Sequence, residues 1–416
     1  MIDMIGVSIP FLDEHTVSNN HGSILKNIEM LCSELGMTLV GEVFWENGQR
    51  KVQRLRHNFE SLPSSFASLA YKVIDGTDLK KIPYVRISGC PAKLLQGHNV
   101  YGSANASLCS FAIFEAFSLA FPELSKALDW YHASIDYLDV TYTARVENEV
   151  VAQQLIDTLR NLNYGQTRVT TENKSFKSTI YWNKGSDHKE LKCYLKLPEL
   201  EHQIKYLTNK WVKEKHDHLA FQLNKITSPE IRQAAIGALR FEARLHSRWL
   251  HANGVTCTFA YLTDPEKQPD FPSLWSKAFN DIFKTFAGAK MNAHDKTEVL
   301  HQLRAVHHRV TPKGNITYSK AESLYDLYTA ITKDGFKKTK ERICERSRAT
   351  WKRKIDDLMA AGLSLAQLMQ FTGDDSNVIP LIRLINVDFA KQLPADFIEP
   401  LPLSRQNLAQ PLRLIA

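Results

Sequence analysis

The sequence predicts an α+β fold followed by a mainly helical C-terminal domain. In residues 1–245, short runs with the two-residue alternation of strands are mixed with runs at helical spacing, but not in the regular order of βαβ units. From Phe271 onward the apolar spacing becomes helical. Gly288 lies where the pattern changes, so we expect one domain over residues 1–288 and a second over residues 289–416.

Seven segments of the first domain show the alternation, and the β-branched and aromatic residues, of strands. The expected strands cover residues 4–9, 68–74, 84–88, 135–144, 178–182, 190–196 and 239–246. Apolar residues at helical spacing predict helices over residues 23–35, 104–120, 149–162, 202–207 and 229–235. Turns that contain glycine separate several of these elements, as at Asp75-Gly76 and Lys184-Gly185.

The composition is that of an ordinary globular protein. The chain has 416 residues, 44% hydrophobic and 23% charged, so a substantial core needs no disulfide or structural metal. Its six cysteines include no Cys-x-x-Cys pair and no His/Cys cluster at zinc spacing, which favours a reducing cytoplasm. The N-terminus lacks the basic start and apolar centre of a signal peptide. Residues 108–121, the most apolar stretch, contain Glu115 and fall short of a membrane span.

Positive charge is concentrated in one segment of the second domain. Residues 333–354 carry ten Lys and Arg against three acidic residues, a surplus equal to the formal charge of +7 of the whole chain. Such a segment attracts phosphates and gives salt-sensitive binding. Helices over residues 338–345 and 348–361 would form a helix-turn-helix-like unit, although a solvated basic helix face is an equally good interpretation. The candidate DNA-binding residues are Lys337, Lys338, Lys340, Arg342, Arg346, Arg348, Lys352 and Arg353.

A tyrosine and two carboxylates lie in three of the expected strands. The alternation around Tyr194 would place Lys192, Tyr194 and Lys196 on one face of a sheet, and two other strands carry Asp139 and Glu242. A phenol beside a lysine, with carboxylates that hold a divalent metal, is what a tyrosine nuclease needs to attack a DNA phosphate. A tyrosine has an unperturbed pKa of about 10, so a nearby ammonium or metal must ease formation of the phenolate. Half-buried packing with a solvated amine is the alternative interpretation.

The two carboxylates would suit Mg²⁺ or Mn²⁺, with water and a substrate phosphate completing the coordination. Because side chains alternate along a strand, we expect Asp136 to point to the face opposite Asp139, and we favour Asp139 as the ligand. Glu242 shares its face with Arg240 and Arg244. A structural ion pair is therefore the other interpretation of Glu242.

Two other patterns offer weaker candidate sites. Glycines on both sides of residues 98–101 predict a shaped turn that presents His98 and Asn99, although a structural loop is the simpler interpretation. A short match to the His-x-x-Arg and tyrosine of tyrosine recombinases is formed by His301, Arg304, Tyr325 and Tyr328. No supporting arginine motif precedes that match.

With these residues in view, the chain resembles the gene II replication initiators of Ff-type filamentous phages nearly from end to end. The segments that carry the resemblance are 1–4 (MIDM), 59–63 (FESLP), 91–102 (PAKLLQGHNVYG), 165–167 (GQT), 194–196 (YLK), 201–203 (EHQ), 240–244 (RFEAR) and 385–390 (INVDFA). The resemblance implies a rolling-circle initiator with an antiparallel-sheet nuclease domain of the Rep or HUH-like type. The helical basic domain would then bind DNA.

The resemblance also implies a chemical mechanism. Tyr194 matches the nucleophile of the family, so it would attack the scissile phosphate of the viral strand, release a 3′-hydroxyl and keep the 5′-phosphate as phosphotyrosine. After one round the same site would cleave and join the displaced strand without ATP, because the phosphotyrosine conserves the energy of the phosphodiester. Lys196 would offset charge in the transition state, and Mg²⁺ or Mn²⁺ would polarise the phosphoryl oxygen.

The metal ligands are implied less completely. Asp139 and Glu242 occupy positions like those of the acidic motifs of related plasmid initiators. Tyr137 stands where relatives tend to carry Arg, and Arg86 stands where a relative has an acidic residue. A third ligand is therefore open, and His98 is the candidate substitute.

The partners implied are double-stranded origin DNA, the displaced single strand, and a host helicase and polymerase, in the host-cell cytoplasm and away from membranes. Two cleavages per cycle with one tyrosine leave a dimer on DNA and turnover at a single site as alternatives. Met291 matches an internal start from which the family makes a shorter product. Two other functions remain open: a DNA-binding replication regulator without nuclease activity, and, with less support, a tyrosine recombinase.

Overall fold

The computed structural model describes most of the chain. The described residues are 1–19, 22–26, 39–46, 49–57, 60–61, 69–74, 76, 82–160, 169–170, 177–215, 217–284, 296–369, 371 and 387–405. The expected domain boundary at Gly288 and the internal start at Met291 lie outside these segments, so both stay predictions.

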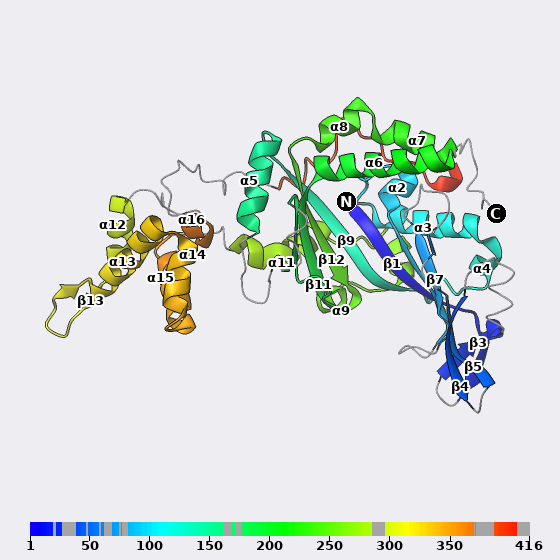
Figure 1. Cartoon of the computed structure of the whole chain (residues 1–416), viewed down its shortest axis with the longest axis horizontal. Helices are drawn as coiled ribbons and strands as arrows, with labels where there is room; N and C mark the ends of the chain where they lie inside the picture. Colours follow the sequence, from blue (N-terminus) through cyan, green and yellow to red (C-terminus); the bar gives the residue numbers. More distant parts are fainter. Residues whose placement is uncertain are drawn as a thin grey trace.

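An eight-stranded antiparallel sheet forms the centre of the structure (Figure 1). Its order is β10 (Thr179–Trp182), β11 (Lys189–Leu195), β12 (Ala238–His246), β9 (Ser134–Arg145), β1 (Ile2–Pro10), β8 (Tyr84–Gly89), β7 (Ala70–Ile74) and β6 (Glu60–Ser61). All the paired strands of this sheet run antiparallel, which confirms the predicted fold class. The order also makes β11, β12 and β9 neighbours, although they are far apart in the sequence.

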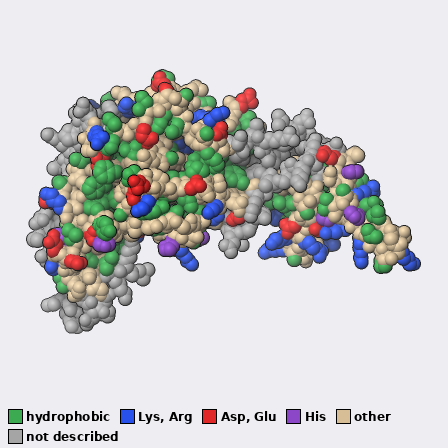
Figure 2. All heavy atoms as spheres, turned by 180° about the vertical axis from the view of Figure 1, so that it is seen from behind, with side chains coloured by type: hydrophobic (Ala, Val, Ile, Leu, Met, Phe, Trp, Pro, Cys, Tyr) green, Lys and Arg blue, Asp and Glu red, His purple; other side chains and the backbone are tan. Residues whose placement is uncertain are grey.

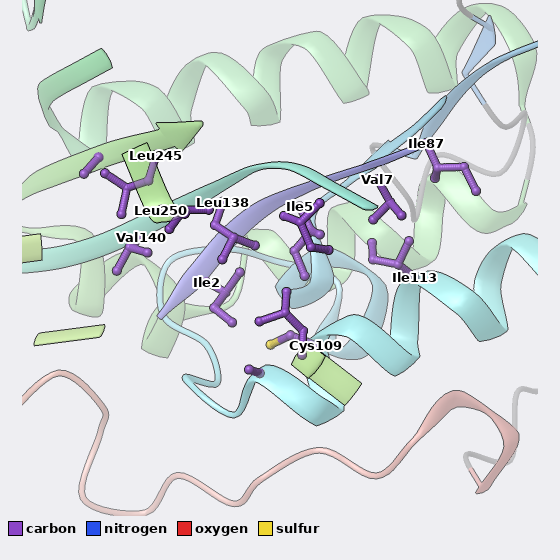
Figure 3. Close-up of a cluster of buried hydrophobic side chains, with 14 of the residues drawn as sticks. Ile2, Ile5, Val7, Ile87, Cys109, Ile113, Leu138, Val140, Leu245 and Leu250 are labelled. Carbon is purple, nitrogen blue, oxygen red and sulfur yellow. The ribbon is translucent and has the colours of Figure 1, made fainter. Parts of the chain in front are cut away.

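Helices cover the apolar face of this sheet and exclude water from it. Ile5 of β1 packs in the same cluster as Ile113 of α3 (Ala106–Ala120), as Figure 3 shows. Farther along the sheet, aromatic rings of α11 (Phe271–Lys284) lie against Phe241 of β12. Each such buried side chain contributes about 1.5–3 kcal/mol of hydrophobic stabilisation. With one face covered in this way, the alternating residues of β9, β11 and β12 that point to the other face are left to form a polar site.

A second group of helices packs at the end of the sheet where Tyr194 lies. It comprises α6 (Lys196–Glu214), α7 (Asp217–Ile226) and α8 (Pro229–Ala235). Leu200 and Leu207 of α6 belong to the small core of this group. Since α6 starts directly after β11, it holds the C-terminal end of that strand.

The remaining elements are short or peripheral. They are η1 (Asp13–His15), β2 (Thr16–Asn19), β3 (Gly22–Leu25), β4 (Leu39–Glu46), β5 (Gln49–His57), α2 (Pro91–Gln96), α4 (Pro122–Lys126), α5 (Glu149–Leu159), α9 (Ser247–Ala252), α10 (Phe259–Thr263), β13 (Arg309–Val310), β14 (Ile316–Thr317) and η4 (Leu403–Arg405). None of the described helices is long and apolar enough to cross a membrane.

Several predicted elements differ from the observed ones. The helix expected over residues 23–35 is wrong at its start, because Gly22–Leu25 is a strand paired with β2; residues 27–35 lie outside the described part. The strand expected over residues 190–196 ends at Leu195, and Lys196 opens a helix instead. The helix expected over residues 202–207 covers only the middle of α6, which begins at Lys196 and carries Pro198 in its first turn.

The helical part has a core of its own. It contains α12 (Lys296–Val306), α13 (Ser319–Asp334), α14 (Phe336–Cys344), α15 (Arg348–Ala360) and α16 (Leu365–Met369). Its apolar cluster includes Tyr328, Trp351 and Leu358 and is separate from the cluster beneath the sheet. Figure 1 shows these helices as a body beside the sheet domain.

The C-terminal segment, residues 387–405, returns to the sheet domain. The side chain of Gln392 accepts a hydrogen bond from the backbone nitrogen of Thr143 at 2.7 Å and donates one to its carbonyl at 3.1 Å. Leu403 is buried in the core beneath the sheet, and its backbone nitrogen donates to Glu115 at 2.8 Å. This segment, which belongs to the second of the two expected domains, therefore packs with the first domain rather than with the helices. The division at residue 288 itself lies outside the described residues and stays a prediction.

Candidate active site

Three neighbouring strands bring the candidate residues onto one face of the sheet. Across β11 and β12, Lys192 pairs with Glu242 and Tyr194 pairs with Arg240. Across β12 and β9, Glu242 pairs with Thr141, and Arg244 pairs with Asp139. These paired residues point to the face opposite the apolar core.

Tyr194 is buried and surrounded by positive charge. The residue is only 3% exposed. The Nζ atom of Lys192 lies 4.3 Å from the centre of its ring, and that of Lys196 lies 5.9 Å away. Burial raises the pKa of Tyr194 well above its usual value, whereas the guanidinium of Arg240 lowers it. Arg240 thus offsets part of the cost of forming a phenolate in a dry site, whereas the carboxylates of Glu242, Asp3 and Glu199 add to that cost.

Lys196 reaches the site from the first turn of α6. It is 1% exposed, and its Nζ donates to Asn99 Oδ1 at 3.0 Å and to Glu199 Oε2 at 2.5 Å. Burial lowers the pKa of Lys196 to about 8, and the carboxylate of Glu199 acts in the opposite direction. The lysine predicted from strand alternation therefore does lie near Tyr194, but the start of a helix holds it there.

Asp3 and Arg240 complete a buried network that the sequence did not reveal. Asn99 donates from Nδ2 to Asp3 Oδ1 at 2.9 Å, so its amide joins Asp3 to Lys196. Arg240 donates to the backbone carbonyls of Asn99 and Val100. The sequence drew attention to the turn that presents Asn99 and placed Arg240 on the face of Glu242, but it predicted no contact between Asn99, Asp3 and Arg240.

Asp139 and Glu242 share a face, and each contacts a cation. Asp139 is fully buried and accepts two hydrogen bonds from Arg244, at 2.8 and 2.7 Å. Glu242 lies 3.4 Å from Nζ of Lys192. Burial raises the pKa of Asp139 to about 7, which the hydrogen bonds from Arg244 oppose and the charge of Glu242 reinforces. Two carboxylates that repel each other in this way would gain from a shared cation.

The residues present fit a divalent ion in part. The hydroxyl of Thr141 is buried without a hydrogen-bond partner, and it lies on the same face as Asp139 and Glu242. An unpaired oxygen ligand on the same face as two carboxylates suits Mg²⁺ or Mn²⁺. In the part of the chain that the structure describes, no group of three or more His, Cys, Asp or Glu side chains could hold a metal. His98 is not brought into such a group; its ring lies 4.7 Å from that of Tyr101.

Asp136 does not point to the opposite face, so that prediction was wrong. Its Oδ2 accepts a hydrogen bond from Ser8 at 2.7 Å and lies 3.1 Å from Nε of Arg86. On the same face, Ser88 lies 2.5 Å from the hydroxyl of Tyr137. The pairing of β1 with β9 shifts by one residue at this point, and such a bulge puts two successive side chains on one face.

The eight candidate DNA-binding residues are all exposed and lie on or between α14 and α15. Figure 2 shows Lys and Arg side chains gathered on this helical part. Ser347 caps α15 by accepting a hydrogen bond from the backbone nitrogen of Thr350, so two helices do meet at the predicted place. Tyr328, one of the two tyrosines of the weak recombinase match, is fully buried in the core of the helical part.

Comparisons with known proteins agree with the resemblance seen in the sequence. A family model for the N-terminal part of the phage replication-associated gene 2 protein matches residues 1–264, and one for its C-terminal part matches residues 310–402. The replication-associated gene 2 protein of Salmonella phage IKe is 35% identical over 98% of this chain and 99% of its own length. That of Enterobacteria phage M13 is 34% identical over 96% of this chain and 99% of its own length.

A solved structure gives a much weaker likeness. The rolling circle replication initiator protein from Geobacillus stearothermophilus is 12% identical, with a TM-score of 0.28 over 68% of this chain and 84% of that one. A likeness of that size carries no argument about the site. The two family matches and the nearly full-length relatives show that the chain belongs to the family of replication-associated gene 2 proteins of filamentous phages.

Proposed function

We propose that this protein initiates and terminates rolling-circle replication of a filamentous phage genome by nicking and rejoining one strand at the origin. The family membership supports a role in phage replication. The observation that supports the chemistry is the position of Tyr194, which shares one sheet face with two carboxylates and lies beside Lys192, Lys196 and Arg240. A phenol surrounded by cations is suited to nucleophilic attack on a phosphate.

In the proposed reaction the Tyr194 oxygen forms a bond to the scissile phosphorus as the bond to the 3′-oxygen breaks. The proton lost by the phenol leaves to solvent, and the 3′-oxygen takes up a proton to give the primer hydroxyl. The 5′-phosphate stays on the tyrosine as a diester. The reverse attack by a 3′-hydroxyl rejoins the strand, and no energy source is needed because the number of phosphate ester bonds does not change.

The positive side chains would have separate tasks. Arg240, which is 1% exposed, is fixed by two backbone carbonyls and favours the phenolate of Tyr194. Lys196 is positioned by Asn99 and would offset charge that develops on the phosphate. The ammonium of Lys192 lies over the Tyr194 ring, so an incoming phosphate would meet it first.

A divalent cation, Mg²⁺ or Mn²⁺, would be held by Asp139 and Glu242 with the hydroxyl of Thr141 nearby, and would polarise a phosphoryl oxygen when bound. His98 stays a candidate for a further ligand only if the turn that carries it moves.

The basic residues of α14 and α15 would hold origin duplex and displaced single strand through their phosphates. Host helicase and polymerase, a dimer on DNA and action in the host-cell cytoplasm belong to the same proposal.

The test is Tyr194→Phe in the full-length protein with supercoiled replicative DNA that carries the cognate origin and with Mg²⁺. Because the variant lacks the nucleophilic oxygen, we expect nicking to fall by at least about 10³-fold. The covalent protein–DNA adduct of the wild type should map to the peptide that contains Tyr194. Tyr131→Phe, at a tyrosine that is 76% exposed, is the matched control and should nick normally.

Full nicking by Tyr194→Phe would refute the proposed nucleophile. Tight origin binding by the wild type, without strand cleavage in Mg²⁺ or Mn²⁺, would instead select the regulator without nuclease activity. That outcome would leave the basic helices α14 and α15 as the functional surface.

A further inference from the structure

A cavity of about 710 Å³ lies next to the candidate active site. Its walls come from the turn that follows α2, from the junction of α7 and α8, and from residues 394–398 of the returning C-terminal segment. The volume is within the range of small-molecule sites, which is about 300–1,000 Å³. The role proposed above for Tyr194 does not use this cavity.

The turn between α2 and α3 has the cavity on one side and the catalytic network on the other. His98 and Tyr101 line the cavity. Between them, Asn99 binds Lys196 with its side chain, and its carbonyl accepts a hydrogen bond from Arg240. A ligand that orders this turn would therefore also fix the cations beside Tyr194.

The lining favours a flat ligand. The rings of Tyr101 and Phe397 both line the cavity, with centroids 5.9 Å apart and planes nearly perpendicular at 89°. The ring of His98 lies against Tyr101 at 4.7 Å. Aromatic side chains of this kind are the platforms on which unpaired bases stack in single-strand binding proteins.

The charges of the lining favour a ligand that donates hydrogen bonds. Glu230 and Asp396 contribute two carboxylates, against the single ammonium of Lys225. Negative charge in excess makes the cavity unsuited to a phosphate. Carboxylates accept hydrogen bonds from the exocyclic amino group of a base such as cytosine, and thymine has no such group.

We propose that this cavity binds one unpaired nucleobase with an exocyclic amino group, from the DNA strand cleaved at Tyr194. The base stacks on the ring of Phe397, with the perpendicular ring of Tyr101 against its edge, and Asp396 or Glu230 accepts its amino hydrogens. The cavity thus reads a base of the strand at the nick, and the turn that carries Asn99 couples this recognition to the catalytic cations. The proposal rests on the function proposed above.

The test uses the full-length protein in EDTA and two fluorescent probes, the single strands dC12 and dT12, with binding measured by anisotropy. Both probes carry the same phosphates, so the basic helices bind them alike, and their affinity ratio reports on the base. We expect the wild type to bind dC12 at least about fivefold more tightly than dT12. Asp396→Asn, an isosteric change at an exposed position, together with Glu230→Gln should reduce the ratio to below about two.

Phe397→Ala should weaken binding of both probes by about fivefold or more through lost stacking. Tyr131→Ala is the control for loss of an aromatic ring at the surface and should bind as the wild type does. Equal binding of the two probes by the wild type, or a ratio unchanged in the Asp396→Asn, Glu230→Gln variant, would overturn the proposal. In that case, nicking of origin DNA that depends on Tyr194 would still support the proposed function. Base discrimination by a protein that does not nick would refute only the proposed function.

Discussion

Lys192, Lys196 and Arg240 differ in how firmly they are held around Tyr194. Arg240 is fixed by backbone carbonyls on a turn, and Lys196 by an amide and a carboxylate. Lys192 makes one long hydrogen bond, 3.4 Å to Glu242, and lies over the Tyr194 ring, and its side chain is 28% exposed. The two buried cations are therefore pre-organised for charge that develops during the reaction, whereas Lys192 is free to follow an incoming phosphate.

The buried ammonium of Lys196 should make the free energy of unfolding depend on pH in the alkaline range. Its pKa is about 8 in the folded protein and 10.5 as an unperturbed lysine, because burial disfavours the charge. Between these values the unfolded chain binds the extra proton, so wild-type stability rises with pH through this window relative to Lys196→Met. Because one unit of pKa shift corresponds to about 1.36 kcal/mol, the free energy of unfolding of the wild type relative to Lys196→Met should rise by about 3 kcal/mol across this window. Urea unfolding of both proteins between pH 7 and 10.5 measures it.

Glu199 supplies the control for this titration. Its carboxylate raises the pKa of Lys196, so Glu199→Gln should move the window to lower pH. A stability difference between wild type and Lys196→Met that stays constant with pH would contradict the prediction.

The sequence could predict those parts of the site that depend on local patterns, but not the contacts between segments that are far apart in the chain. Tyr194, Asp139 and Glu242 stand in strands whose alternation is local, so the shared face could be predicted once those strands were paired. Asp3 and Arg240 meet only because β1 and the turn at Asn99 converge in space. No spacing rule connects residues that are so far apart in the chain.

At the scale of elements, the irregularity between β1 and β9 shows where alternation fails as a guide. A strand of constant period would separate Asp136 from Tyr137, but the register shift brings both to one face. The shift also places the Tyr137 ring against Gly6, where a Cβ atom would come within 2.6 Å of Cδ1 of the ring. The sequence shows a glycine in a strand but not the ring that needs the space.

Gly6→Ala should therefore destabilise the sheet. The new methyl group would displace the Tyr137 ring, which has Arg244 4.3 Å from its centre, and overpacking of this kind costs about 1–3 kcal/mol. Chemical unfolding of the variant measures the loss. In a Tyr137→Ala background the same change should cost little, so an equal cost in both backgrounds would show that the ring is not the cause.

Helix α6 shows a different limit of the sequence. Its first turn follows β11 without a connecting loop, and residues 190–196 continue the strand pattern up to Lys196. Leu200 and Leu207 enter the core of the helical group, but the strand-like alternation that runs up to Lys196 hides the start of the helix. Element type was predictable there, but the boundary beside the nucleophile was not.

At the scale of the whole molecule, the returning C-terminal segment ties the end of the chain to the sheet domain. Leu403 is 3% exposed within the main core, so Leu403→Ala should cost about 2–5 kcal/mol in unfolding free energy of that domain. Leu401→Ala is the matched control, since Leu401 is 57% exposed and its loss should change stability by at most about 0.5 kcal/mol. Equal, small effects of both substitutions would mean that the segment contributes nothing to the fold.

The basic helices should account for much of the salt dependence of DNA binding. Removal of one phosphate contact lowers the slope of log affinity against log salt by about 0.9 on duplex DNA, so removal of four should lower it by about 3.6. The changes are Lys337→Gln, Lys338→Gln, Lys352→Gln and Arg353→Gln, made together in the full-length protein and measured by anisotropy on a duplex between 50 and 300 mM salt.

The control removes four charges from exposed lysines of the sheet domain and the returning segment, through Lys126→Gln, Lys267→Gln, Lys277→Gln and Lys391→Gln. Because both variants lose the same net charge, a smaller slope in the first alone assigns the phosphate contacts to α14 and α15. Equal slopes in the two variants would instead mean that the duplex senses only the overall charge of the protein.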